Sequence, residues 1–306
     1  MPAPIQRIAI VGFGEVGGIF GNDFAQQGIQ VSVFDILFAS KRHRPKMMSK
    51  ARKCGVRAAD NLADCVRGAE LVISAVTSSA SLDVAKKAGR ILRPGQLFLD
   101  INSVSPEAKR KAAVYIDRSK AHFVEAAVMA AVPKPRLRVP MLLGGAHAKE
   151  AAERLSAIGM NAMAVSDEIG IASAVKMCRS VMVKGFEALA VECLFAARRF
   201  GAEDAVVESL AATYPSLGWK DHLPDYLVSR VAEHGSRRAA EMREVAQTLR
   251  SVRLNPTMAL ATAERQGRLV SEMARRNIPF NPEAFSWRSL ADALAHGKRR
   301  GSKRID

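Results

Sequence analysis

The sequence predicts an α/β fold in which an N-terminal, doubly wound parallel sheet is followed by an all-helical domain. Up to about residue 165, short apolar runs alternate with helical segments, which is typical of a parallel sheet covered by helices. From residue 166 the strand pattern ends and only helical periodicity remains. We therefore expect two domains, over residues 1–165 and 166–306.

The individual elements follow from these patterns. Strands are predicted at six apolar runs, 8–13, 31–35, 71–76, 97–102, 122–128 and 140–145, with helices between several of them, for example over 17–28 and 81–92. In the second domain a first helix is expected to begin with a cap at Ser166 and acidic residues in its first turn, and to run toward Gly201. Further helices are predicted at 203–213, 224–251, 256–276 and 286–296.

Composition limits the class of protein. The chain has 306 residues, 48% hydrophobic and 25% charged, which is ordinary for a globular protein. Its net charge of +16 is partly terminal, because the last ten residues hold Lys298, Arg299, Arg300, Lys303 and Arg304 against Asp306. Acidic substrates or cofactors explain this balance as well as DNA does, and no zinc-finger, basic-zipper or RNP pattern is present, so specific nucleic-acid binding is not expected.

Cysteine usage and the start of the chain indicate the compartment. Cys54, Cys65, Cys178 and Cys193 form no C-x-x-C pair, so neither a zinc site nor a disulfide framework is expected, and no metal is assigned. MPAPIQR leads into a strand without a secretory segment, and no apolar run is long enough to cross a bilayer. We expect a cytoplasmic protein that does not interact with membranes.

A glycine-rich turn follows the first strand. Gly12-Phe13-Gly14-Glu15-Val16-Gly17 matches G-x-G-x-x-G between a strand and a helix, where glycines allow a tight turn and close approach of a pyrophosphate. The free N–H groups of the helix N-terminus favour the anion. The alternatives are a plain turn or a site for another adenosine ligand, such as a methyl donor. The complete unit favours a dinucleotide-binding Rossmann domain.

Asp35 ends the second strand, where an acid can accept hydrogen bonds from both adenosine ribose hydroxyls. A 2′-phosphate would meet like charge there, which favours NAD, although the following Lys41 to Arg44 could hold such a phosphate and keep NADP possible. The other interpretation of this basic run is a solvated face, made of Lys41, Arg42, His43, Arg44, Lys46, Lys50, Arg52 and Lys53.

The stretch 170–187 predicts a largely buried helix that carries cations. Lys176, Ser180 and Lys184 are four residues apart, with Arg179 beside them, so they share one face. A buried cation needs a partner. This face is therefore expected either to be exposed to solvent or to lie against an anionic group.

Three further segments occur in a familiar order: Asp100 to Pro106 after a strand, Glu125 to Ala131 at the end of another, and Gly170 to Ser180 on the helix. In this order and spacing they resemble the β-hydroxyacid dehydrogenase family, which includes 6-phosphogluconate and 3-hydroxyisobutyrate dehydrogenases, and the second half resembles its subgroup with a divergent helical domain. The resemblance implies that Lys176 is the general acid or base, with Ser180 beside it. It implies cofactor contacts from Gly12, Phe13, Gly14, Glu15, Val16, Gly17, Asp35, Val76, Thr77, Asn102 and Ser103.

Two departures from the family pattern concern the substrate. The family's substrate loop reads D-A-P-V-S-G-G, and Met129 stands here in place of its serine; Ser180 stands where the helix normally carries asparagine. The apolar loop favours a 3-hydroxy acid with an apolar or aromatic substituent over a phosphorylated sugar acid. The expected substrate contacts are Ser103, Val128, Met129, Ala130, Arg179, Arg237 and Arg238, although Arg237 could equally pair with Glu241 four residues on.

The sequence therefore predicts an NAD(P)-dependent oxidoreductase that acts on a small anionic 3-hydroxy acid at a cleft between the domains. The alternatives are an imine reductase-like enzyme of the same architecture, against which Lys176 speaks, and a nonenzymatic dinucleotide sensor. The helical domain is expected to form a homodimer or higher homo-oligomer. Trp219 and Tyr226 could flank the substrate pocket, although packing in the core is the expected role of each. Lys184 is expected to pair with an acid or to support the electrostatic field of the site.

Overall fold

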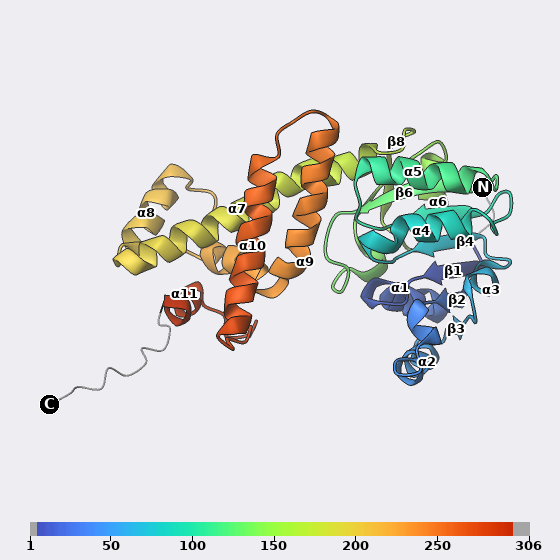
Figure 1. The fold of residues 1–306 in the computed structure, drawn as a ribbon, viewed down its shortest axis with the longest axis horizontal. Helices are drawn as coiled ribbons and strands as arrows, with labels where there is room; N and C mark the ends of the chain where they lie inside the picture. The colour runs from blue at the N-terminus through green and yellow to red at the C-terminus, as the bar shows by residue number, and fades with distance from the viewer. Residues whose placement is uncertain (1–4, 296–306) are drawn as a thin grey trace. The chain divides into compact units, whose positions relative to one another are not determined.

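The computed structural model describes residues 5–295 (Figure 1). The basic tail, residues 1–4 and the last residue of the helix expected over 286–296 lie outside that range. The chain divides into two compact units, Met1–Met177 and Cys178–Asp306. This division falls within helix α7 (Ile171–Phe200), about two turns after the helix begins.

One mixed sheet organises the first unit. Its eight strands, counted over the described residues, have the order β3-β2-β1-β4-β5-β6-β7-β8. Strands β1 to β6 are parallel, β7 runs antiparallel to β6, and β8 is parallel to β7. Their bounds are β1 (Arg7–Val11), β2 (Gln30–Phe34), β3 (Arg57–Ala58), β4 (Leu71–Ser74), β5 (Leu97–Asp100), β6 (His122–Val128), β7 (Met141–Gly144) and β8 (Ala162–Ser166).

Helices cover both faces of this sheet, because successive strand side chains point to opposite sides. On one face Ile8 and Ile10 pack with α1 (Glu15–Gln26), α2 (Arg44–Lys53) and α6 (Ala148–Ala157). On the other face Ala9 and Val11 pack with α3 (Leu62–Val66), α4 (Ser78–Ala88) and α5 (Pro106–Asp117). Short 3-10 turns occur at η1 (Ile36–Ala39) and η2 (Arg136–Arg138). The expected doubly wound α/β architecture is confirmed.

The sheet differs from the expectation at one edge. The run predicted at 140–145 is β7, which reverses direction, so the sheet is not wholly parallel. Strands β3 and β8 were not expected. Strand β3 is only two residues long. Strand β8 lies at the edge of the sheet, and its Met163 and Val165 are exposed, so these apolar residues do not indicate a buried face.

The start of α7 also differs from the expectation. Ser166 belongs to β8, and its hydroxyl accepts the Glu168 N–H at 3.0 Å, so it does not cap the helix. Gly170 has a φ of +106°, which interrupts helical geometry just before Ile171.

The second unit is helical, as predicted. It contains the rest of α7, then α8 (Glu203–Thr213), α9 (Leu223–Ser251), α10 (Thr257–Arg275) and α11 (Trp287–Ala295). Helices α9 and α10 lie side by side (Figure 1), and Gly235 allows their close approach, because a Cβ there would lie 2.5 Å from the Gln266 carbonyl oxygen. Trp219 is buried in this core as expected, whereas Tyr226 is 54% exposed, so its assignment to the core was wrong. No helix of residues 5–295 is long and apolar enough to span a membrane.

Candidate functional site

The parallel strands bring the expected cofactor residues to one edge of the sheet. Strands β1, β2, β4, β5 and β6 all end at this carboxyl edge. The segments that leave them hold the residues expected at the site: Gly12 to Gly17, Asp35, Val76 and Thr77, Asn102 and Ser103, and Val128 to Ala130. Ligands of open α/β sheets bind at such an edge, where the strand order reverses.

The glycine-rich turn leaves open space where a ligand would approach. Gly12 has a φ of +96°, and a Cβ on it would lie 2.3 Å from the Ala75 carbonyl oxygen. A Cβ on Gly17 would lie 2.0 Å from the Gly12 carbonyl oxygen, so this glycine lets α1 pack on the turn. A Cβ on Gly14, in contrast, meets no described atom within 4 Å, and no side chain in 5–295 caps α1 there. The turn therefore fits a pyrophosphate held by the N–H groups of α1.

Asp35 is held beside this turn by two backbone donors. Its Oδ2 accepts the Phe13 N–H at 2.8 Å and its Oδ1 accepts the Leu37 N–H at 2.9 Å. A carboxylate oxygen can accept more than one hydrogen bond, so both oxygens retain capacity for hydroxyl donors. This geometry suits a ribose whose two hydroxyls donate to one carboxylate.

Lys50 also reaches the glycine-rich turn. Its Nζ donates to the carbonyl oxygens of Phe13 at 2.8 Å and Gly14 at 2.6 Å, and lies 4.5 Å from the centroid of the Phe13 ring. Lys50 is half-buried, whereas the other members of the basic run are exposed, as a solvated face requires: Lys41, Arg42, His43, Arg44, Lys46, Arg52 and Lys53. Lys50 lies on α2, more than 30 residues after the turn, so no local pattern indicates this contact.

A buried polar network connects the ends of β4 and β5. The Asn102 side chain accepts the Val76 N–H at 2.7 Å and donates to Ser74 Oγ at 2.9 Å and to Asp100 Oδ1 at 2.6 Å. Lys109, 1% exposed, donates to the Asp100 carbonyl oxygen at 2.7 Å and lies 3.1 Å from Oδ1. Asn102 therefore fixes the two loops that border the edge.

Lys109 was not singled out from the sequence, although a signal existed. It shares an α5 face with Ala112, Ala113 and Ile116, at the spacing of a buried stripe, and the chain carries Asp100 shortly before. A cation on such a stripe needs a buried acid.

A buried carboxylate anchors the helix that carries Lys176. Glu125 on β6 is fully buried; its Oε1 accepts the N–H groups of Gly170 at 2.6 Å and Ala172 at 3.0 Å, and its Oε2 accepts the Ser173 hydroxyl at 2.8 Å. Lys176 follows within one turn, is half-buried, and belongs to the same unit as the sheet. Glu125 therefore fixes the start of α7 to the strand that leads into Val128 and Met129.

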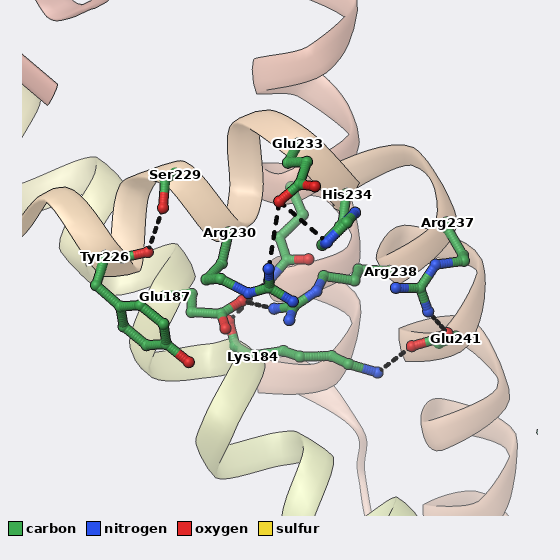
Figure 2. A network of polar contacts seen from close by, with 11 residues as sticks. Lys184, Glu187, Tyr226, Ser229, Arg230, Glu233, His234, Arg237, Arg238 and Glu241 are labelled. Atoms are coloured by element: carbon green, nitrogen blue, oxygen red, sulfur yellow. Dashed lines mark hydrogen bonds and ion pairs between the residues drawn. The ribbon is translucent and has the colours of Figure 1, made fainter. Parts of the chain in front are cut away.

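The remaining expected residues lie in the helical unit. Arg179 is exposed and Ser180 is buried on α7. Lys184 Nζ lies 2.6 Å from Glu241 Oε2, and Arg237 pairs with the same carboxylate, so the alternative in which Arg237 and Glu241 pair four residues apart is confirmed. Figure 2 shows these contacts and the buried pair of Arg238 with Glu187.

Burial lowers the pKa of Lys184, and the Glu241 carboxylate opposes that shift. Gln266, fully buried, donates to the Lys184 carbonyl oxygen at 3.0 Å. The network therefore joins α7, α9 and α10, and its two carboxylates, Glu187 and Glu241, offset part of the charge of Lys184, Arg237 and Arg238. The expected pairing of Lys184 with an acid is confirmed.

Comparison with known proteins agrees with this arrangement. The family model described as the NAD binding domain of 6-phosphogluconate dehydrogenase matches residues 7–170, and a model described as a domain of unknown function, DUF1932, matches residues 197–269. A 3-hydroxyisobutyrate dehydrogenase of Pseudomonas aeruginosa is 25% identical over 224 residues, covering 69% of this chain and 71% of its own length.

Two further relatives cover more of the chain. A protein of Methanothermus fervidus, described as an uncharacterized 28.5 kDa protein, is 31% identical over 84% of this chain and 96% of its own length. The crystal structure of a conserved hypothetical protein from Sinorhizobium meliloti is 36% identical, with a TM-score of 0.80, over 96% of this chain and 97% of its own. The similarity thus extends through both units.

Proposed function

This chain belongs to the β-hydroxyacid dehydrogenase-like family, and we propose that it is an oxidoreductase that transfers a hydride between NAD and a small 3-hydroxy acid. The observation that carries the proposal is the carboxyl edge, where the open Gly14 turn and the Asp35 carboxylate lie in the same unit as the half-buried Lys176. The named dehydrogenase among its relatives supports this reaction class.

The cofactor assignment rests on charge. When bound, NAD supplies the hydride acceptor, and this chain's residues bind and orient it. The α1 N-terminus suits the pyrophosphate, and Asp35 suits the unmodified ribose, since its carboxylate would repel a 2′-phosphate. The Val76, Thr77, Asn102 and Ser103 loops, fixed by the Asn102 side chain, would border the nicotinamide.

Lys176 is proposed to move the proton. In oxidation the neutral Nζ of Lys176 would take the proton of the substrate hydroxyl, while the carbon that bears this hydroxyl gives its hydride to NAD. In reduction the ammonium group would return the proton to the oxygen. A half-buried lysine can serve at neutral pH if desolvation lowers its pKa. Glu125 is a positioning residue for this step, because it holds the first turn of α7.

The proposed substrate class rests on the end of β6 and the two residues that follow it. Val128, Met129 and Ala130 place apolar side chains where a sugar-binding site would need donors, so the substituent of the hydroxy acid is proposed to be apolar or aromatic. Ser103 and Arg179 are proposed to contact the substrate, with Ser180 beside Lys176. Of the two further arginines, Arg237 is 60% exposed whereas Arg238 is buried against Glu187, so Arg237 is the better candidate for an anion contact.

The test is turnover of a panel of 3-hydroxy acids by wild type and Lys176→Ala. General acid or base catalysis contributes about 10²- to 10⁴-fold, so kcat should fall by that factor while NADH affinity is retained. Lys111→Ala removes an exposed lysine of α5 that pairs with Glu107 and should keep wild-type kinetics. Unchanged turnover in Lys176→Ala would show that this lysine is not the general acid or base. A higher kcat/KM for 6-phosphogluconate than for any 3-hydroxy acid of the panel would contradict the proposed substrate class.

A further inference from the structure

A cluster of two histidines and one carboxylate lies apart from the carboxyl edge. His122 is the first residue of β6, His147 immediately precedes α6, and Glu150 lies in the first turn of that helix. Each offers a ligand atom, and these atoms all lie within 4.8 Å of one another. We propose that His122, His147 and Glu150 form a binding site for a divalent transition-metal ion of the zinc type.

Backbone contacts hold the three side chains on two packed elements. The His122 N–H donates to the Gln96 carbonyl oxygen at 2.8 Å, which fixes the amino end of β6 in the sheet. The Ala151 N–H donates to the His147 carbonyl oxygen at 2.9 Å, so His147 is tied to the first turn of α6. Glu150 is three residues after His147 and therefore lies above the same helix face.

The two imidazole rings face each other. Their centroids are 3.7 Å apart and their planes differ by 2°. Zinc binds histidine nitrogen at about 2.0–2.1 Å, so side-chain rotation that turns one nitrogen of each ring toward a shared ion would be needed for binding. Each imidazole offers a ring nitrogen, and the neutral ring is the form that binds a metal ion.

Two further charged side chains lie near the cluster. Asp117, at the end of α5, interacts electrostatically with His147 and is therefore a second carboxylate near the cluster. Arg154 lies 3.7 Å from Glu150, a loose ion pair that an ion would displace.

The donor set indicates the metal class. Two imidazoles with a carboxylate suit zinc, and also cobalt, nickel and copper, whereas calcium and magnesium prefer oxygen donors alone. The cysteine spacing that spoke against zinc does not bear on this site, because its donors are histidine and glutamate. The site joins β6 to α6 at the amino end of the strand, about 20 Å along β6 from Val128. Bound metal is therefore a structural clamp on the sheet and not part of the hydride site.

The experiment is a titration of tag-free, chelator-treated full-length protein with Zn²⁺ by calorimetry and with Co²⁺ by visible absorption. We expect one ion per chain, a Co²⁺ spectrum of low-symmetry nitrogen and oxygen ligation, and a melting temperature that rises with Zn²⁺. His122→Ala, His147→Ala and Glu150→Gln should each weaken Zn²⁺ binding by at least about tenfold. His43→Ala, an exposed histidine bonded to Ser40, is the matched control and should bind as wild type.

Glu150 is exposed, so Glu150→Gln keeps the test valid if a histidine variant fails to fold. NADH affinity should stay the same in every variant, with or without Zn²⁺, which separates this site from the proposed cofactor site. Absence of saturable binding up to about 1 mM Zn²⁺ would overturn the proposal, and so would a loss of Zn²⁺ affinity in His43→Ala as large as in the three ligand variants.

Discussion

Lys50 changes the charge of the glycine-rich turn through one side chain. Its ammonium group donates to the Phe13 and Gly14 carbonyl oxygens, so a positive charge lies beside the N–H groups of α1. Both features favour an anion at this point. The turn therefore has a fixed cation from α2 in addition to the backbone groups that the G-x-G-x-x-G pattern provides.

His122 makes stability depend on pH in the metal-free protein. Burial lowers its pKa below the ordinary value of 6.5, so the unfolded chain binds the proton more tightly. Stability from this residue is fully present above about pH 6.5 and is lost as pH falls toward the lowered folded-state pKa. We expect wild type to lose more stability than His122→Gln between about pH 7.5 and pH 5, measured by urea unfolding in chelator. Equal losses in the two proteins would contradict this.

Sequence spacing predicted local partners and missed distant ones. Arg237 and Glu241 are four residues apart on one helix, so their pairing was foreseeable. The partner of Arg238 is Glu187, on α7 and 51 residues away, and the partner of Lys109 is Asp100, reached through the α5 and β5 packing. Spacing shows which side chains share a face, and only the fold determines what lies opposite.

The start of α7 is determined by an element far away in the sequence. Ser166 and the acids after it match a local helix start, yet Gly170 delays the helix to Ile171 and Glu125 of β6 takes the free N–H groups. When the acid that accepts the first N–H groups of a helix lies on a strand, the helix sequence itself does not indicate it. The local cap pattern is therefore weaker guidance to the helix start than a buried acid within a predicted strand.

Glu125→Ala should destabilise the first unit. The substitution leaves two buried N–H groups without their acceptor, each costing about 1–3 kcal/mol, so we expect a loss of about 2–6 kcal/mol in the free energy of unfolding. Glu168→Ala, at an exposed position nearby, should change stability by less than about 0.5 kcal/mol. Urea unfolding measures both, and similar values for the two variants would show that Glu125 does not hold the helix.

At the scale of the molecule, the sequence predicted the layers and the order of the elements. The alternation of strands and helices was sufficient for β1, β2, β4, β5 and β6, because these strands have buried faces with continuous apolar runs. The reversal at β7 could not be predicted, since strand direction depends on the connection and not on side-chain pattern. The glycine turn and Asp35 could be identified because they form a motif with a recognisable spacing in the sequence. The roles of Lys50, Lys109 and Glu125 could not, because these side chains contact other elements of the fold.

The helical unit presents an apolar stripe that we propose as a homodimer contact. Met182 and Leu189 are seven residues apart on α7 and are 75% and 56% exposed, and Phe200 at the end of the helix is 87% exposed. Large apolar side chains at this spacing form a continuous surface. We expect sedimentation to give twice the chain mass of 33.1 kDa, and Leu189→Glu to give the single chain mass.

Val114→Glu is the control for this change, because it places a charge at a similarly exposed apolar residue of α5. It should sediment as wild type. A wild-type protein that sediments as one chain at all concentrations would show that the α7 stripe has no such role.

The measurement that tests the central claim most directly is titration of the purified protein with NADH and NADPH, followed by nicotinamide fluorescence. Saturable binding of NADH, tighter than NADPH, is expected, because Asp35 accepts ribose hydroxyls and repels a 2′-phosphate. Asp35→Asn should narrow the difference in affinity between NADH and NADPH. Tighter binding of NADPH would indicate that Lys41 and its basic neighbours select the cofactor. Binding of neither dinucleotide would contradict the proposed function itself.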